Sequence, residues 1–152
     1  MKARSPLLTV RSRVRSGGAP SLRMMRMWAR AALGRGVHGE IALLLVGPTA
    51  SRSLNRRYRH RDHATSVLSF PATGEARRAG LLGDLVVCPA VLKAEARAQG
   101  KTLTAHWAHL LVHGVLHLMG FDHVKPPDAR RMERREIRIL RRLGFADPYR
   151  VR

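Results

Sequence analysis

The segment from Trp107 to Met119 constrains the fold more than any other part of this 152-residue chain. If it is helical, apolar side chains cover nearly the whole circumference of the helix, and such a helix is buried. These side chains belong to Trp107, Leu110, Leu111, Val112, Val115, Leu116, Leu118 and Met119. The chain length suits one domain with a real hydrophobic core. We therefore expect a single domain over residues 1–152, with residues 1–6 and 150–152 as flexible ends.

The remaining segments predict an α+β fold. Four short apolar or alternating segments are typical of strands: Leu7–Val14, Ile41–Val46, Thr65–Phe70 and Gly83–Cys88. Capping residues and apolar spacing predict helices over Ser21–Leu33, from Pro48 through Arg57, and over Pro89–Gly100, Thr104–Gly120 and Ala129–Leu143. The polar segment Thr73–Ala79 is expected to be a loop. Because strands come early and helices late, we expect one mixed sheet of about four strands with helices packed on it.

Two histidines of the buried segment predict a metal site. His113 and His117 are four residues apart, so on a helix their side chains meet on one face, with Cβ atoms roughly 5–6 Å apart. That spacing lets two imidazoles share one ion at Zn–N distances of about 2.0–2.1 Å. His106 and His109 fall on the same stripe. Two imidazoles that face each other inside a core are unusual, because buried polar rings need partners, and a shared metal ion would be such a partner.

The residues after this helix predict a third ligand. Gly120 can take a positive φ angle and turn the chain back, which brings His123 toward the pair. Three histidine ligands leave the fourth tetrahedral position for water or substrate, whereas structural zinc sites are closed by four protein ligands. The pattern therefore predicts one catalytic zinc ion per chain, bound by His113, His117 and His123.

The motif differs from that of the zinc metalloproteases. Their His-Glu-x-x-His motif has a glutamate base directly after the first histidine, and here that position is Gly114. Peptidase activity would lack its usual proton acceptor. Gly114 is expected to allow close packing or a close approach of the substrate.

The charge predicts an anionic partner. The chain has 29 Lys and Arg against 10 Asp and Glu, a formal net charge of +19, with a sequence pI of about 11.9. Such a field attracts polyanions, and nucleic acid is the leading one. A GC-rich genome would favour Arg over Lys, but it would not remove Asp and Glu. The basic face of the last helix either contacts phosphates or only improves solubility, and the sequence leaves both alternatives open.

The compartment is predicted from several weaker signals. No apolar stretch approaches the roughly 18 residues of a membrane-spanning helix, so we expect a soluble protein. Cys88 is the only cysteine, which fits a reducing compartment, and its apolar setting predicts a buried residue. The Arg-rich, acid-free start resembles a mitochondrial transit peptide, but the strand and helix expected there belong to the domain. We expect the bacterial cytoplasm, with the mitochondrial matrix as the alternative.

Several segments resemble the YbeY family of rRNA-maturation endoribonucleases. The most specific is His113-Gly-Val-Leu-His117-Leu-Met-Gly120-Phe-Asp122-His123. Others are Leu54–Arg59, Thr65–Pro71, Gly83–Cys88, His106–His109 and Gly144–Tyr149. The resemblance runs from about Ile41 onward, and the N-terminal forty residues match by pattern alone. Ser66 stands where many members have Asp, which puts a supporting carboxylate at that position in doubt.

This resemblance implies a function. It is that of a single-strand-specific, zinc-dependent endoribonuclease acting in small-subunit rRNA 3′-end maturation and ribosome quality control. Implied partners are rRNA and the small ribosomal subunit, a ribosome-associated GTPase and a small-subunit protein, with no membrane. Two rival interpretations stay open: a non-enzymatic assembly factor with a structural zinc, and a zinc hydrolase or peptidase acting on another substrate.

The resemblance also assigns roles to single residues. It makes the three histidines the zinc ligands and Arg59 the essential basic residue of the cleft, so we expect Arg59 and His113 to act in catalysis. Arg57, Arg59 and Arg61 are the candidates for RNA contact. Asp122 either orients a ligand histidine or stabilises the turn, and His109 either hydrogen-bonds within the site or is a satisfied core residue.

Overall fold

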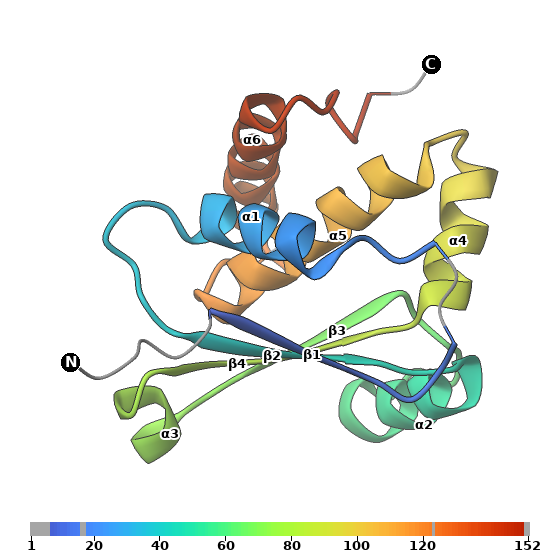
Figure 1. Ribbon diagram of the computed structural model, residues 1–152, viewed down its shortest axis with the longest axis horizontal. Coiled ribbons are helices and arrows are strands. Elements are labelled where there is room, and N and C mark those ends of the chain that lie inside the picture. The colour runs from blue at the N-terminus through green and yellow to red at the C-terminus, as the bar shows by residue number, and fades with distance from the viewer. Residues whose placement is uncertain (1–6, 16–17, 123, 151–152) are drawn as a thin grey trace.

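The computed structural model describes residues 7–15, 18–122 and 124–150. Within these ranges, four strands form one sheet in the order β1-β2-β4-β3 (Figure 1). The strands are β1 (Leu8–Ser12), β2 (Glu40–Leu45), β3 (Val67–Pro71) and β4 (Leu81–Val87). β1, β2 and β4 are parallel, and β3 is antiparallel to β4. The expected α+β fold with one mixed sheet is confirmed.

Helices cover both faces of this sheet. α1 (Leu22–Leu33), α4 (Pro89–Ala98), α5 (Leu103–Leu118) and α6 (Pro126–Arg142) lie on one side, and α2 (Pro48–Arg59) and α3 (Gly74–Arg78) on the other (Figure 1). The main core lies between the first group and the sheet. A smaller core of Val46, Leu68 and Val86 lies on the side of α2. Cys88 follows β4 and is fully buried.

α5 occupies the centre of the main core, as its sequence predicts. Trp107, Leu111, Val115 and Leu116 are each at most 1% exposed. A Cβ atom added at Gly114 would lie 2.9 Å from Leu85 Cδ2 of β4. Gly114 therefore allows α5 to pack closely on the sheet, which confirms the first of the two roles expected for it.

Three sequence predictions about helices are wrong, one about a loop and two about where a helix begins. The segment Thr73–Ala79, predicted to be a loop, contains α3, whose single turn is too short to show an apolar period. Arg77 holds this turn against the sheet and α5 by donating to Leu82 O and Leu118 O. α6 begins at Pro126, before the expected Ala129, because proline suits the first helical position. α5 is capped by Thr102 instead of Thr104: the Thr102 hydroxyl accepts from Ala105 N at 3.1 Å.

No helix in the described part of the chain combines the length and the apolar character needed to cross a bilayer.

Candidate metal centre

The last two turns of α5 bring His113 and His117 together. Their Nε2 atoms lie 3.1 Å apart, and both rings are partly exposed. Two nitrogens bound at 2.0–2.1 Å to one tetrahedral ion stand about 3.3 Å apart. The 3.1 Å separation is that of a hydrogen bond between the two rings, and it is also close to the distance between two ligands of one ion. The pair therefore fits the metal ion that the spacing predicts once the proton between the rings is lost.

The chain reverses directly after this pair. Gly120 has a φ of 97°, Gly120 N donates to His117 O at 3.0 Å, and Phe121 N donates to Leu116 O at 3.1 Å. These two bonds form a Schellman motif, in which a left-handed residue ends the helix. The predicted reversal is confirmed. The third predicted ligand, His123, lies outside the described residues.

A cleft of about 220 Å³ opens beside the two histidines. It is lined by Arg59, Val67, Ser69, Pro71, His113 and His117. Arg59 is the last residue of α2, and its Nη2 donates to Ser69 O at 2.7 Å. Ser69 Oγ in turn donates to Gly114 O of α5 at 3.4 Å. β3 therefore connects the arginine to the histidine helix, so the cleft combines a fixed guanidinium with two imidazoles.

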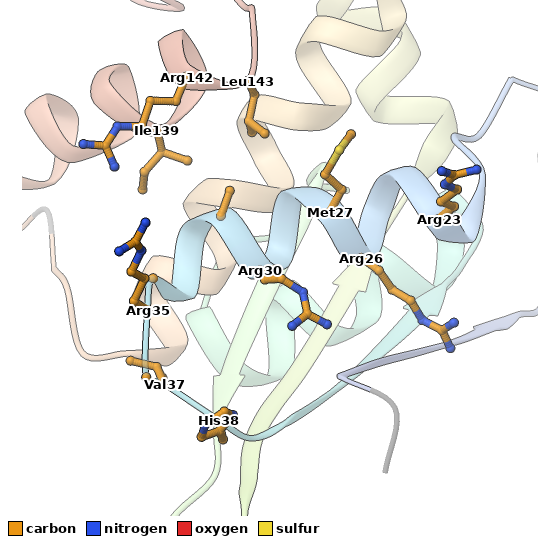
Figure 2. A pocket seen from close by; sticks show the side chains of 13 residues that line it. Arg23, Arg26, Met27, Arg30, Arg35, Val37, His38, Ile139, Arg142 and Leu143 are labelled. Carbon is orange, nitrogen blue, oxygen red and sulfur yellow. The ribbon is translucent and has the colours of Figure 1, made fainter. Parts of the chain in front are cut away.

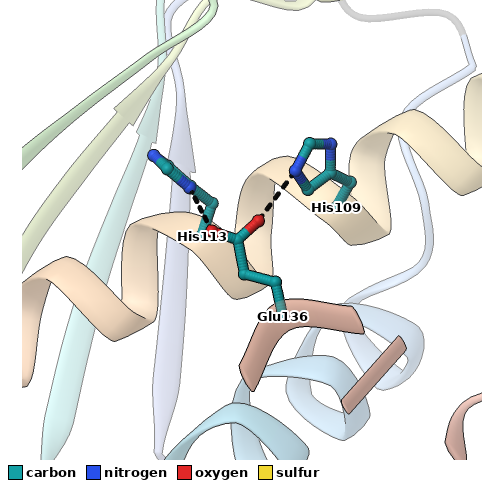
Figure 3. A group of neighbouring side chains, drawn as sticks. All are labelled: His109, His113 and Glu136. Carbon is teal, nitrogen blue, oxygen red and sulfur yellow. Dashed lines mark hydrogen bonds and ion pairs between the residues drawn. The ribbon is translucent and has the colours of Figure 1, made fainter. Parts of the chain in front are cut away.

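A buried carboxylate lies behind the histidines. Glu136 of α6 is completely buried. Its Oε1 accepts from His113 Nδ1 at 2.7 Å, and its Oε2 accepts from His109 Nε2 at 2.9 Å (Figure 3). Its Oε2 also accepts from the Tyr149 hydroxyl at 2.6 Å. Because His113 Nδ1 carries the proton in this bond, the lone pair of His113 is on Nε2, the atom next to His117.

The electrostatics of this group favour a charged Glu136. Burial raises the pKa of its carboxyl, but the hydrogen bonds from His109 and His113 outweigh burial and lower the pKa to about 2. Burial also lowers the pKa of His109, which its bond to Glu136 opposes. Burial and the bond to Glu136 both raise the pKa of the Tyr149 hydroxyl. Glu136 is therefore an ionised acceptor surrounded by three donors.

His109, His113 and Glu136 form a possible metal site themselves, because one ligand atom from each lies within 4.8 Å of the others. Their atoms, however, already make donor–acceptor pairs with each other at hydrogen-bond distances. A metal ion there would have to displace the ring protons. The geometry better fits an outer hydrogen-bonding partner that orients His113, which is a common arrangement behind histidine ligands.

The other described residues that the sequence predicts for the site do not line the cleft, except Arg59. Arg57 is exposed in the last turn of α2, with its Cζ 5.4 Å from the Tyr58 ring, and Arg61 is exposed just after that helix. Neither lines the cleft. The Asp122 carboxylate accepts from Val124 N at 3.1 Å and so stabilises the turn. Its role toward a ligand histidine stays a prediction, since His123 is not described.

Sequence reasoning placed His109 near the site but missed its acceptor. His109 is 9% exposed and bonds within the site through Glu136. Glu136 shares the inward stripe of α6 with Met132 and Leu140. An acidic residue at an apolar position of an amphipathic helix was the signal that could have revealed it. Tyr149 gave no comparable signal.

The fold and the site define a single-domain α+β protein with a histidine-based candidate metal centre. The sequence model of the family described as Endoribonuclease YbeY matches residues 22–144. The Endoribonuclease YbeY of Pseudomonas putida is 46% identical over 140 residues, covering 90% of this chain and 89% of that protein. That of Methylococcus capsulatus is 46% identical over 139 residues, covering 91% and 92%. The chain belongs to the YbeY family.

One solved structure supports the fold independently. The solution structure of TM1509 from Thermotoga maritima matches with a TM-score of 0.58, covering 93% of this chain and 99% of that one. At 21% sequence identity this likeness concerns the fold alone.

Proposed function

We propose that this protein is a zinc-dependent endoribonuclease that cleaves single-stranded RNA. The observation that carries the proposal is the cleft in which Arg59 lies with His113 and His117, whose Nε2 atoms are 3.1 Å apart. The substrate class, RNA, comes from the endoribonuclease activity for which the family is named. When bound, zinc supplies Lewis-acid chemistry toward phosphate oxygens and water.

The residues of the chain have separate tasks in this proposal. His113, His117 and His123 hold the ion, and Glu136 holds the Nδ1 proton of His113 so that its Nε2 lone pair is aimed at the ion. Arg59 binds the scissile phosphate with the N–H groups that its bond to Ser69 O does not use. Arg57 and Arg61 contact the RNA backbone nearby. With 5% aromatic residues, base stacking contributes little, so recognition is of the backbone.

The cellular role that we propose is small-subunit rRNA 3′-end maturation and ribosome quality control. Its partners are rRNA and the small subunit, together with a ribosome-associated GTPase and a small-subunit protein. The net charge of +19 supports contact with an RNA-rich particle. The proposed compartment is the bacterial cytoplasm.

The test is cleavage of a labelled single-stranded RNA by Arg59→Ala and Arg59→Lys, with zinc content measured beside it. Both variants keep their zinc, and both lose at least about tenfold in cleavage rate, because lysine cannot make two parallel bonds to a phosphate. The matched control is Arg56→Ala, an exposed arginine of the same helix that does not line the cleft, and it cleaves like the wild type. Full cleavage by Arg59→Lys contradicts the role given to Arg59.

The rival interpretations predict other results. An assembly factor with a structural zinc binds zinc and small-subunit particles but leaves RNA intact in every variant. A zinc peptidase cleaves a peptide substrate and leaves the RNA intact in the wild type and in every variant.

A further inference from the structure

A second concave surface lies away from the cleft. It is a groove of about 780 Å³ between α1, the segment that joins α1 to β2, and the end of α6. Its apolar part is formed by Met27, Ala31, Val37, Ile139 and Leu143. Figure 2 shows Ile139 of α6 and Leu143, the residue directly after α6, on one side of α1, whereas Arg26 and Arg30 point to the other side. It shares no lining residue with the cleft at His113. We call this surface the α1–α6 groove.

Arginines follow the rim of the α1–α6 groove. Arg23, Arg26 and Arg30 recur along α1 at spacings of three and four residues, so they project from one side of that helix. Arg35 and Arg142 continue the series at the groove's end (Figure 2). No Asp or Glu lines the groove, and none of these five arginines takes part in an ion pair within the described ranges. Arg26 donates from Nε to Leu8 O at 3.2 Å, which places part of its guanidinium against β1. An anionic partner would relieve the mutual repulsion of these arginines.

The apolar part of the α1–α6 groove indicates which anionic partner fits. Met27 is 52% exposed and Val37 38%, which places two of the large exposed apolar side chains of the described chain in this one groove. A phosphate backbone offers nothing to cover them. No Phe, Tyr or Trp lines the groove, and its one aromatic ring is that of His38, so bases would find little stacking surface there. A polypeptide with apolar anchors between acidic residues satisfies both features.

We propose that the α1–α6 groove binds an acidic amphipathic helix of a partner protein. Leucine-type anchors of that helix would cover Met27 and Val37, and its carboxylates would pair with the rim arginines. This inference goes beyond the proposed ribonuclease activity and does not depend on it, because the groove and the cleft are separate.

The test uses a fluorescein-labelled peptide of about 16 residues, made of Glu with Leu at helical i, i+3, i+4 and i+7 spacing, and a scramble of the same composition. Fluorescence anisotropy is expected to give at least tenfold tighter binding of the patterned peptide. Met27→Glu and Arg30→Glu each weaken that binding about tenfold or more. The matched control is Arg78→Glu, an exposed arginine of α3 on the other side of the sheet, and it changes binding less than threefold.

Several outcomes overturn the proposal. The proposal is wrong if the scramble binds as tightly as the patterned peptide, or if Arg78→Glu weakens binding as much as Arg30→Glu does. Either result means that binding depends only on the overall charge. If a single-stranded RNA displaces the peptide and loses affinity by the same factor in Met27→Glu and Arg30→Glu, the groove is an RNA surface. RNA cleavage by Arg30→Glu is measured in parallel, and unchanged cleavage separates this test from that of the proposed function.

Discussion

Glu136 explains which ring nitrogen of His113 is left to face His117. A neutral imidazole has one donor nitrogen and one acceptor nitrogen, and the hydrogen bond of one ring nitrogen decides the role of the other. At His113 this choice is made by the 2.7 Å bond from Nδ1 to the Glu136 carboxylate. The same carboxylate fixes His109 and Tyr149, so three side chains depend on one buried charge.

Glu136→Gln is therefore expected to weaken zinc binding by about 10–100-fold, the usual effect of removing a hydrogen-bonding partner of a ligand histidine. A competition titration with a chromophoric zinc chelator measures it. Glu133→Gln serves as the control, since Glu133 is exposed on the same helix. An unchanged zinc affinity in Glu136→Gln would show that the carboxylate has no part in orienting His113.

A second acid, Glu95, gives a prediction about acid stability. Burial raises the pKa of its carboxyl, but the hydrogen bonds from His106 and Ser66 outweigh burial and hold the pKa below its usual 4.5. The charged form is thus favoured by folding. Its contribution is present above about pH 4.5 and is lost as the pH falls through the lower folded-state pKa.

In Glu95→Gln, the unfolding free energy from urea titration should consequently fall less than in the wild type between about pH 5 and about pH 3. Glu75 is an exposed acid of α3, so the unfolding free energy of Glu75→Gln should fall as much as that of the wild type over the same pH range. Parallel curves for Glu95→Gln and the wild type would contradict the lowered pKa.

At the scale of elements, the end of α5 controls the site. Gly120 at φ 97° lets α5 end at Leu118, one residue after His117, and turns the chain back at Phe121. No atom lies within 4 Å of a Cβ added at Gly120, so an alanine there would be strained by its backbone and not by its neighbours.

Gly120→Ala should lower stability by about 1–2 kcal/mol, the cost of a left-handed conformation for an alanine. Thermal unfolding of the metal-free protein measures this loss. Gly120→Asn is the informative companion, because asparagine tolerates that conformation and should recover part of the loss. If alanine and asparagine behave like glycine, the left-handed turn is not needed to end the helix.

The sequence predicted most elements because their signals are local. The apolar circumference of α5 required burial, and the spacing of His113 and His117 required a shared face; both are confirmed. α3 was not predicted because a single polar turn shows no apolar period. The role of Glu136 was not predicted because its partners on α5 are 23 and 27 residues away in the sequence. Only the packing of α6 against α5 brings them together. His123 and Arg59 as functional residues stay predictions, although Arg59 does line the cleft.

At the scale of the whole molecule, the net charge of +19 should dominate RNA affinity. Each phosphate neutralised on a single strand contributes a slope of about −0.7 to the logarithm of affinity against the logarithm of salt. For about four contacts, affinity should drop about fiftyfold between about 50 and about 200 mM salt. Filter binding of a short single-stranded RNA measures this. A flat dependence would mean that the basic surfaces serve solubility alone.

The central claim is that the histidine cleft cleaves RNA with a metal ion, and metal removal tests it most directly. The measurement is the cleavage rate of a labelled single-stranded RNA by the same protein preparation before chelation, after chelation and after adding back one equivalent of zinc. The account predicts that chelation abolishes cleavage and that about one zinc per chain restores it. Undiminished cleavage by the metal-free protein, or a zinc-loaded protein that leaves RNA intact, would contradict it.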